Sequence, residues 1–265
     1  MINISSAELN ALLSAFVLPL ARILALVLSS PIFSNPALPL RVRVGLAMMI
    51  TLVVAPTLVA PSAAIDPGSL QGLLILAQQI VIGLAMGFAV RITFVAVEAA
   101  GELAGLQMGL GYATFFDPQV AGHIPVIGRF LGLVGTLVFL TLDGHLQIIY
   151  FLSRSFSTMP IDASTLQAPT FLMLVHWGAE IFRAGVLLAM PLLASLLIAN
   201  LALGVLTRAA PQLNLFAVGF PLTLALGLVM LSLALPFFGP ALERLFMDGL
   251  AAMQRVTAAL PAAVP

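Results

Sequence analysis

The sequence predicts an all-α protein that lies in a membrane or is buried in a larger apolar assembly. Hydrophobic residues make up 62% of its 265 residues, whereas soluble domains contain about 45–50%. Charged residues make up only 8%, against about 25% in a soluble domain. Long apolar stretches follow one another along the chain, and most of them are long enough to cross a bilayer as helices. The expected architecture is about six long, kinked helices with an irregular insert between the third and the fourth.

Composition and motifs exclude several classes of function. Ten basic residues, all of them Arg, balance ten acidic ones, so the chain offers no basic surface for nucleic acid. The absence of Cys excludes disulfides, iron–sulfur clusters and thiolate metal sites. No motif of a metalloprotease, a serine hydrolase or a P-loop enzyme is present. We therefore expect no enzyme, cofactor or metal site. Three classes of function remain open: a secondary transporter, a channel or protein-conducting subunit, and an assembly factor.

The first two expected helices span Leu9–Leu28 and Val44–Val59, on either side of a proline-rich connection. Arg22 lies within the first apolar run, where a charged side chain needs either a buried partner or a route to the interface. Of these two interpretations we favour the second, because Arg22 is only one or two turns from the end of the helix.

The third expected helix runs from Leu70 to about Val97 and carries small residues at a spacing of four. This spacing lets the backbone of another helix approach closely. The helix-packing glycines that we predict from it are Gly83, Gly87, Gly101, Gly105 and Gly109.

Three charged residues lie near one stripe of this helix, namely Arg91, Glu98 and Glu102. Two acids four residues apart can form a proton or cation site, as in a secondary transporter. They can also be buried polar contacts between helices or subunits. We favour polar contacts and keep a polytopic secondary transporter that uses Glu98 and Glu102 as the alternative.

The helical pattern stops between Gly109 and Gly128, in an insert of about residues 106–127 that remains mostly apolar. Irregular backbone at membrane depth is tolerated only where it is buried in protein or lines a cavity. The insert is therefore either a re-entrant packing loop or a plug in a passage. Its candidate plug residues are Met108, Leu110, Tyr112, Phe115, Phe116, Asp117, Val120 and Ile124.

The second part of the chain has a simpler pattern. A fourth helix over Ile127–Phe156 is interrupted at Asp143-Gly144-His145, which we interpret as a kink rather than a charged pair in a passage. A polar linker follows, and it divides the chain into residues 1–160 and 161–265. Helices over Phe171–Leu206 and Leu215–Phe238 then form a hairpin, with a Glu180–Arg183 pair, a polar tip and an amphipathic tail.

Several blocks of this sequence resemble the FliR proteins of the flagellar type III export apparatus and their SctT-type counterparts in injectisomes. They are PIFSNPALPLRVRVGLA at Pro31–Ala47, AGELAGLQMGLGYATFFDP at Ala100–Pro118, DGH at Asp143–His145, SFSTMP at Ser155–Pro160 and ALGVLTRAAPQLNLFAVGFPL at Ala202–Leu222. The last block is the most specific of them. Many members of the family carry Glu at the position of Gln79, so a role of that carboxylate does not transfer to this chain.

The resemblance implies a core subunit of the protein export gate in the bacterial inner membrane, at the flagellar basal body. Such a subunit is present as a single copy in a hetero-oligomer with FliP and FliQ, contacts FlhB and FlhA, and passes unfolded flagellar subunits. Residues 1–160 would then be FliP-like and residues 161–265 a FliQ-like hairpin, with much of the assembly above the bilayer plane and membrane lipid around the rest.

The same resemblance implies roles for two segments. It places the insert in the pore as a plug, with Phe115 and Phe116 as the best candidates for apolar closure. It also places the tip of the hairpin against partner subunits, through Arg208, Pro211, Gln212 and Asn214.

Overall fold

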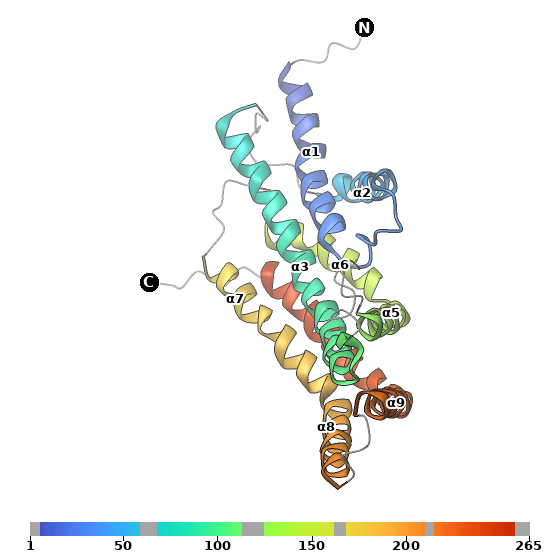
Figure 1. Ribbon diagram of the computed structural model, residues 1–265. Coiled ribbons are helices and arrows are strands. Elements are labelled where there is room, and N and C mark those ends of the chain that lie inside the picture. The colour runs from blue at the N-terminus through green and yellow to red at the C-terminus, as the bar shows by residue number, and fades with distance from the viewer. Residues whose placement is uncertain (1–5, 59–67, 113–124, 162–167, 210–214, 258–265) are drawn as a thin grey trace. The chain divides into compact units, whose positions relative to one another are not determined.

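The computed structural model describes residues 6–58, 68–112, 125–161, 168–209 and 215–257, and in these residues every element of regular secondary structure is a helix (Figure 1). This agrees with the all-α class expected from the sequence. The helices, in order, are α1 (Ser6–Ser29), α2 (Leu40–Val54), η1 (Ala55–Thr57), α3 (Leu70–Gln107), η2 (Leu110–Tyr112), α5 (Val126–Thr141), α6 (Gly144–Thr158), α7 (Ala168–Gly178), α8 (Glu180–Ala209) and α9 (Leu215–Thr257).

The chain divides into two compact units. Unit 1 consists of Met1–Ile92, Asp143–Gly178 and Met247–Pro265, and unit 2 of Thr93–Leu142 and Ala179–Phe246. The two long helices α3 and α9 each contribute one end to each unit. These spatial units differ from the FliP-like and FliQ-like parts of the sequence, whose division at residue 160 stays a prediction.

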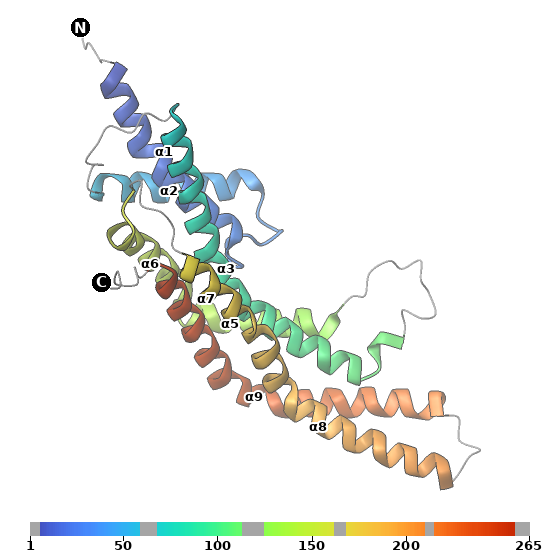
Figure 2. The ribbon, with the colours of Figure 1, turned by 90° about the vertical axis from the view of Figure 1, so that its left-hand side faces the viewer.

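In unit 1, α1 lies beside the N-terminal half of α3, and α2 crosses α1 at a steep angle (Figures 1 and 2). The contact between α1 and α3 is close because Gly83 of α3 faces the carbonyl group of Arg22 and the Cβ atom of Ala25. Ile23 and Met86 are fully buried in the core of this unit. A glycine on one helix thus allows apolar side chains of both helices to interdigitate.

The core of unit 2 is a cluster of three aromatic rings from three different helices. Phe94 of α3, Phe139 of α5 and Phe246 of α9 have ring centroids 4.9–5.3 Å apart, in edge-to-face and tilted arrangements. These distances are in the favourable range for aromatic pairs, which add to the free energy gained from burial. The cluster fixes α3, α5 and α9 against one another at one level of the unit.

The break at Asp143 confirms the expected kink. Asp143 has a left-handed backbone conformation, with φ 54° and ψ 27°, between α5 and α6. Its carbonyl oxygen accepts hydrogen bonds from the backbone N–H groups of Leu146 (2.9 Å) and Gln147 (3.1 Å) at the start of α6. The left-handed conformation of Asp143 ends α5, and its carbonyl oxygen accepts the first backbone hydrogen bonds of α6.

Two other expectations about helix boundaries are wrong. The single helix expected over Phe171–Leu206 is two helices, because α7 ends at Gly178 and α8 begins at Glu180. Conversely, α9 continues as one helix to Thr257, through Pro221, Pro236 and Pro240, where the sequence suggested an end at Phe238. Each proline removes one backbone hydrogen bond, but the neighbouring bonds remain and the helix is kept.

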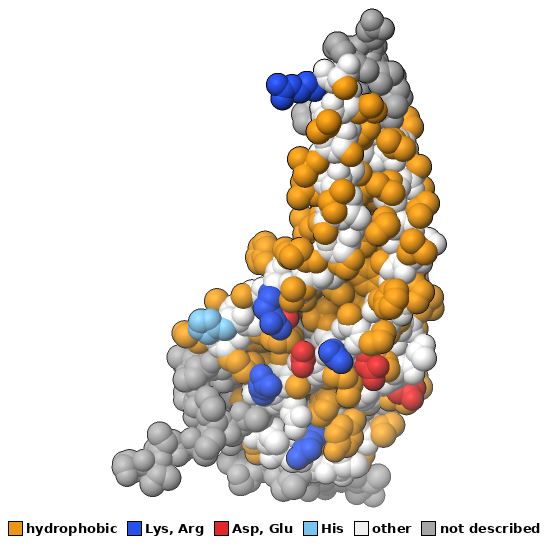
Figure 3. Space-filling model, turned by 90° about the horizontal axis from the view of Figure 1, so that it is seen from below, with side chains coloured by type: hydrophobic (Ala, Val, Ile, Leu, Met, Phe, Trp, Pro, Cys, Tyr) orange, Lys and Arg blue, Asp and Glu red, His pale blue; other side chains and the backbone are white. Residues whose placement is uncertain are grey.

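Four helical stretches of the described residues are long and apolar enough to cross a membrane, or five if α5 and α6 form one broken span. They are Leu40–Thr57, Leu70–Gln107, Leu172–Ala209 and Gly219–Thr257. Hydrophobic side chains cover much of the face shown in Figure 3. Together with the composition, these helices identify an integral membrane protein.

Candidate functional site at the base of the central loop

The central insert leaves α3 at Met108, whose side chain is fully buried in unit 2. The side chain lies directly against Gly227 of α9, so a methyl group added at Gly227 would overlap it. The Met108 carbonyl oxygen also accepts a hydrogen bond from the Oγ1 atom of Thr223 on the same helix (3.4 Å). The N-terminal end of the insert is therefore attached to α9 by packing and by one hydrogen bond.

Gly109, the next residue, has a φ angle of 87°. This conformation costs a residue with a Cβ atom free energy but is open to glycine, which commonly ends helices in this way. The short helix η2 follows. Gly109 thus redirects the chain immediately beyond the anchored Met108.

The other end of the insert joins the start of α5, where Gly128 meets Gly101 of α3. A Cβ atom on Gly101 would lie 2.6 Å from the Cα atom of Gly128 and 2.7 Å from the carbonyl oxygen of Ile127. The two backbones can approach this closely only because neither residue has a side chain. The insert is therefore held at both ends, by α9 at Met108 and by α3 at Gly128.

The predicted plug residues fall into two groups. Met108 is buried at the base and does not project from unit 2, and Leu110 is partly exposed in η2. The other side chains lie outside the described residues, and their role in a plug stays a prediction. They are Tyr112, Phe115, Phe116, Asp117, Val120 and Ile124.

The remaining predicted packing glycines have different surroundings. Gly87 lies against Ser29 of α1, so a methyl group there would overlap the Ser29 hydroxyl oxygen. Gly105 has room for a methyl group, because the nearest atom, Cγ1 of Ile127, would be 3.6 Å away. Glycines at equal spacing in the sequence therefore pack against their neighbours at different distances.

The three charged residues predicted as buried polar contacts are all exposed on this chain. They are Arg91, Glu98 and Glu102 of α3. These side chains are therefore not buried within this chain. The carboxylate of Glu98 lies along α5, where a Cβ atom on Gly132 would be 3.2 Å from the Glu98 Oε1 atom.

In the described part of unit 1, the charged side chain that is buried is that of Arg22. We had expected this side chain to reach the membrane interface. That expectation is wrong, because the Arg22 side chain is fully buried. Its Nε atom donates to Oε1 of Gln79 (2.8 Å), Nη1 to the Ser155 carbonyl (3.0 Å) and Oγ (3.1 Å), and Nη2 to the Met159 carbonyl (2.8 Å). The guanidinium carbon also lies 4.3 Å from the centre of the Phe156 ring.

This Arg22 cluster, defined by Arg22, Gln79, Ser155, Phe156 and Met159, joins α1, α3 and the C-terminal end of α6. The guanidinium supplies donors to two carbonyl groups at the end of α6: that of Met159, just beyond the last helical turn, and that of Ser155, which also accepts the backbone N–H of Met159. Within the cluster, the Nε2 atom of Gln79 is buried without a hydrogen-bond partner among the described residues. The sequence indicated this cluster only by placing polar residues within otherwise apolar segments.

At the hairpin tip, Arg208 ends α8 and is exposed, whereas Pro211, Gln212 and Asn214 lie outside the described residues. The expected Glu180–Arg183 pair is confirmed, with the Arg183 Nε atom 2.9 Å from Oε2 of Glu180. Among the residues that the structure describes, no three His, Asp or Glu side chains lie close enough together to hold a metal ion.

Comparison with known proteins adds to this geometry. The family model described as "Bacterial export proteins, family 1" matches residues 13–249. The chain is 45% identical over 248 residues to "Flagellar biosynthetic protein FliR" of Pectobacterium carotovorum subsp. carotovorum, with 94% of each chain covered. It is 43% identical to FliR of Escherichia coli (strain K12) with the same coverage, and 31% identical to FliR of Bacillus subtilis (strain 168), with 83% of this chain and 85% of the relative covered.

Proposed function

The chain belongs to the FliR family of bacterial export proteins, components of the flagellar export apparatus, and we propose that it is a core subunit of the channel that passes unfolded flagellar subunits. It assembles as a single copy with FliP and FliQ at the flagellar basal body. The observation that carries this proposal is the similarity to FliR proteins along almost the whole chain. The family and the long apolar helices indicate an inner-membrane location, and much of the assembly lies above the bilayer plane.

The distribution of exposed apolar surface supports assembly with other subunits. In the most apolar part of α3, 61% of the residues are buried, whereas the corresponding parts of Leu40–Thr57, Leu172–Ala209 and Gly219–Thr257 are only 17–28% buried. Soluble monomers rarely expose contiguous apolar surface on this scale. Helices of FliP and FliQ, together with lipid, cover these faces.

The anchored base of the central insert supports a part in closing the pore. Attachment at Met108 and Gly128 fixes the two ends of the insert in unit 2. Apolar side chains in that segment, above all Phe115 and Phe116, close the channel to ions because a narrow apolar constriction excludes water. An extended polypeptide in transit displaces them.

The hairpin tip contacts FlhB or the neighbouring FliQ, and FlhA lies at the same cytoplasmic entrance. Arg208 is exposed at the end of α8 and has several N–H donors for partner carbonyl groups. Pro211, Gln212 and Asn214 complete this contact surface.

Co-purification tests the assembly. The tagged full-length chain is expressed with and without FliP and FliQ from the same source, and the products are weighed by native mass spectrometry. We expect one copy of this chain in a large hetero-oligomer, and cross-linking from Gln212 to FlhB or FliQ in the same preparation. A stable monomer or homodimer in the presence of both partners would contradict the proposal.

A further inference from the structure

The helix α2 packs against the rest of unit 1 through one narrow face. Its buried residues are Ala47, Thr51 and Val54, which share a side of the helix because they are four and three positions apart. The opposite face is apolar and open, with Met49 68% exposed and Leu52 63% exposed. Figures 1 and 2 show α2 lying across α1. One long apolar face of α2 therefore remains uncovered by the described residues of unit 1.

Gly45 lies at the centre of this open face. At 3.6 residues per turn it stands between Arg41, one turn before it, and Met49 and Leu52, one and two turns after it. A Cβ atom built on Gly45 would have no contact within 4 Å. Glycine in the middle of a helix lowers the stability of the helix relative to alanine. Gly45 has this cost although no described residue needs the space.

Other helical glycines of the chain show what such a position can serve. A Cβ atom on Gly83 would overlap the carbonyl group of Arg22, and one on Gly101 would lie 2.6 Å from the Cα atom of Gly128. Both glycines lie where a second helix of this chain crosses at close range. Gly45 differs from them because no helix of the described chain crosses α2 there.

The open face carries a positive charge toward its N-terminal end. Arg41 is exposed and makes no ion pair with any residue that the structure describes. Arg43 donates from Nη2 to the carbonyl oxygen of Asn35 (2.8 Å), while its Nε atom is buried without a partner among the described residues. Because α2 contains no Asp or Glu, this face offers hydrogen-bond donors and positive charge but no carboxylate.

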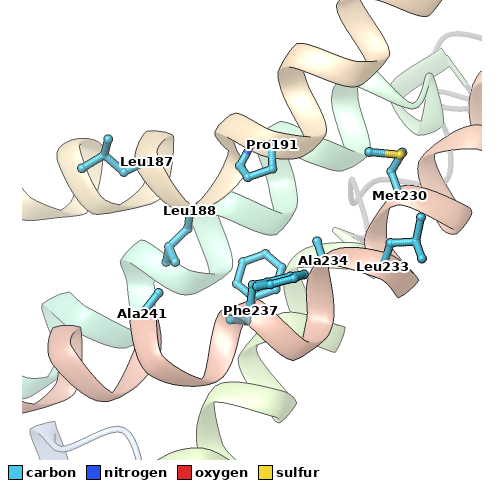
Figure 4. Close-up of a pocket in the computed structure, with 9 residues that line it drawn as sticks. Leu187, Leu188, Pro191, Met230, Leu233, Ala234, Phe237 and Ala241 are labelled. Carbon is cyan, nitrogen blue, oxygen red and sulfur yellow. The ribbon is translucent and has the colours of Figure 1, made fainter.

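The apolar pocket between α8 and α9 gives no comparable indication of an occupant. Figure 4 shows its lining, in which Leu187, Leu188 and Pro191 face apolar side chains of α9. An apolar lining alone fits lipid and protein equally well. On α2, by contrast, an open glycine and an unpaired arginine lie one turn apart on one face.

We propose that an apolar helix of a partner subunit crosses α2 at Gly45 and places a carboxylate beside Arg41. The missing side chain lets the backbone of the partner approach closely, and Met49 and Leu52 are buried on either side of the crossing. Covering Arg41 with apolar surface alone would leave its N–H donors without acceptors, which costs free energy. A carboxylate is the acceptor that matches the guanidinium group in charge and in geometry.

Two other occupants fit this face less well. Fluid acyl chains fill irregular surfaces without needing a glycine, so lipid gives no reason for Gly45. A second copy of this chain would bring another Arg41 and no acid to the contact, because α2 has none. The inference rests on the hetero-oligomer proposed above and names the face of α2 that a partner covers.

Native mass spectrometry of the full-length chain, co-expressed with FliP and FliQ, tests the crossing. Gly45→Leu places a side chain where the partner backbone lies and should lower the ratio of assembled to free chain about tenfold. Gly45→Ala should lower this ratio less. In the chain purified alone it should raise the melting temperature by up to about 4 °C, because alanine favours the helix and meets no atom there.

Gly83→Ala is the matched control, since its methyl group overlaps the Arg22 carbonyl and should lower the melting temperature of the chain alone. If Gly45→Leu assembles as well as the unchanged chain, no helix crosses at Gly45. If the unchanged chain itself forms no hetero-oligomer, the proposed function fails and this inference fails with it. The two failures are therefore distinguishable.

The charge and the identity of the occupant are tested separately. Arg41→Gln should lower the ratio of assembled to free chain and Arg41→Glu should lower it further, because two carboxylates would then face each other. Arg154→Gln, at an exposed position on α6, is the control, and equal ratios for all three variants would overturn the carboxylate. In the purified complex, a photo-cross-linking residue in place of Met49 should link to FliP or FliQ. A link to lipid or to a second copy of this chain would overturn the proposal.

Discussion

Arg22 is a buried cation whose donors are satisfied by oxygen atoms of an amide, a hydroxyl group and two backbone carbonyls. No carboxylate pairs with it in the part of the chain that the structure describes. Arg tolerates such a position better than Lys, because its planar group carries five N–H donors and is weakly hydrated. The amide oxygen of Gln79 accepts the Nε–H of Arg22 at a position where a carboxylate could form an ion pair.

We predict that Gln79→Glu stabilises unit 1 by about 1 kcal/mol. The substitution removes the buried, unpaired Nε2 donor, which costs free energy in the native state, and places a carboxylate against the buried guanidinium of Arg22. Thermal unfolding of the purified chain can be followed through the fluorescence of Trp177, the only Trp of the sequence, whose indole N–H bonds to Ala89 in the same unit.

Arg22→Met provides the companion measurement. It should lower the free energy of unfolding by ~1–3 kcal/mol, because the Met159 carbonyl and the Gln79 amide oxygen lose the donor that Arg22 supplies. The Ser155 carbonyl keeps the backbone N–H of Met159. In this background Gln79→Glu should destabilise the chain, since its carboxylate would be buried without a partner. If Gln79→Glu has the same effect in both backgrounds, the two side chains are not coupled. Arg91→Met, at an exposed position on α3, is the control.

At this scale, the sequence indicated which residues were unusual but not how they are satisfied. An Arg within an apolar run was recognisable as a residue in need of a partner. Its partners are 57 to 137 residues away along the chain, and a single sequence does not show which distant residues meet. The distance of Arg22 from the helix end therefore favoured the wrong interpretation.

At the base of the central insert, the backbones of α3 and α5 come close together where Gly101 and Gly128 cross. Here backbone meets backbone, whereas one turn along α3 the neighbour of Gly105 is the side chain of Ile127. The two glycines belong to one stripe of the same helix. Gly101 nevertheless lies at a contact that requires glycine, whereas Gly105 lies at a contact that has room for a methyl group.

We predict that Gly101→Ala destabilises the chain and Gly105→Ala does not. The first substitution drives a methyl group into backbone atoms that cannot move aside, which costs ~1–3 kcal/mol. The second places a methyl group in ordinary van der Waals contact and gains up to about 1 kcal/mol of helix propensity. Calorimetric unfolding of both variants in the same detergent makes the comparison. Equal melting temperatures would refute the tight crossing.

Several helices could be derived from the sequence, because apolar runs bounded by Pro, Gly and Asp specify their own ends. The break between α5 and α6 was predicted at Asp143-Gly144-His145, but the left-handed conformation of Asp143 was not. The break after Gly178 was missed, although Gly178 and the nearby polar residues His176 and Glu180 mark it, because the apolar pattern continues on both sides. The continuity of α9 was also missed, because Pro236 and Pro240 suggest an end that the apolar surroundings do not enforce.

On the scale of the whole molecule, composition alone determined the class. The membrane character follows from hydropathy, which depends on no tertiary contact. The attachment of the central insert to α9 could not be derived, because it pairs Met108 with Gly227 and Thr223 of the hairpin. The plug residues and the hairpin tip beyond Arg208 rest on the sequence and its resemblance, and their roles stay predictions.

We predict that shortening the insert between Gly111 and Gly122 leaves assembly intact and makes the membrane leaky to small ions. Both anchors lie outside the deleted residues, so unit 2 should keep its packing. Removing the apolar side chains should let water fill the constriction. Ion flux across membranes that contain the complete assembly is the measurement.

A matched control replaces residues 113–124 with a Gly/Ser segment of equal length. If apolar closure is what blocks ions, this variant should leak as well, because length is kept and only the aromatic and aliphatic side chains are lost. Unchanged conductance in both variants would show that the insert does not close the pore.

The interleaving of the two units has a consequence for biosynthesis. Unit 1 contains residues from both ends of the chain, since Met247–Pro265 joins Met1–Ile92. Neither unit can therefore finish folding while the ribosome is still making α9. α1 and the N-terminal half of α3 must wait, with apolar faces uncovered, until residues 247–257 of α9 have been made, so insertion factors and partner subunits can act on these helices during that interval.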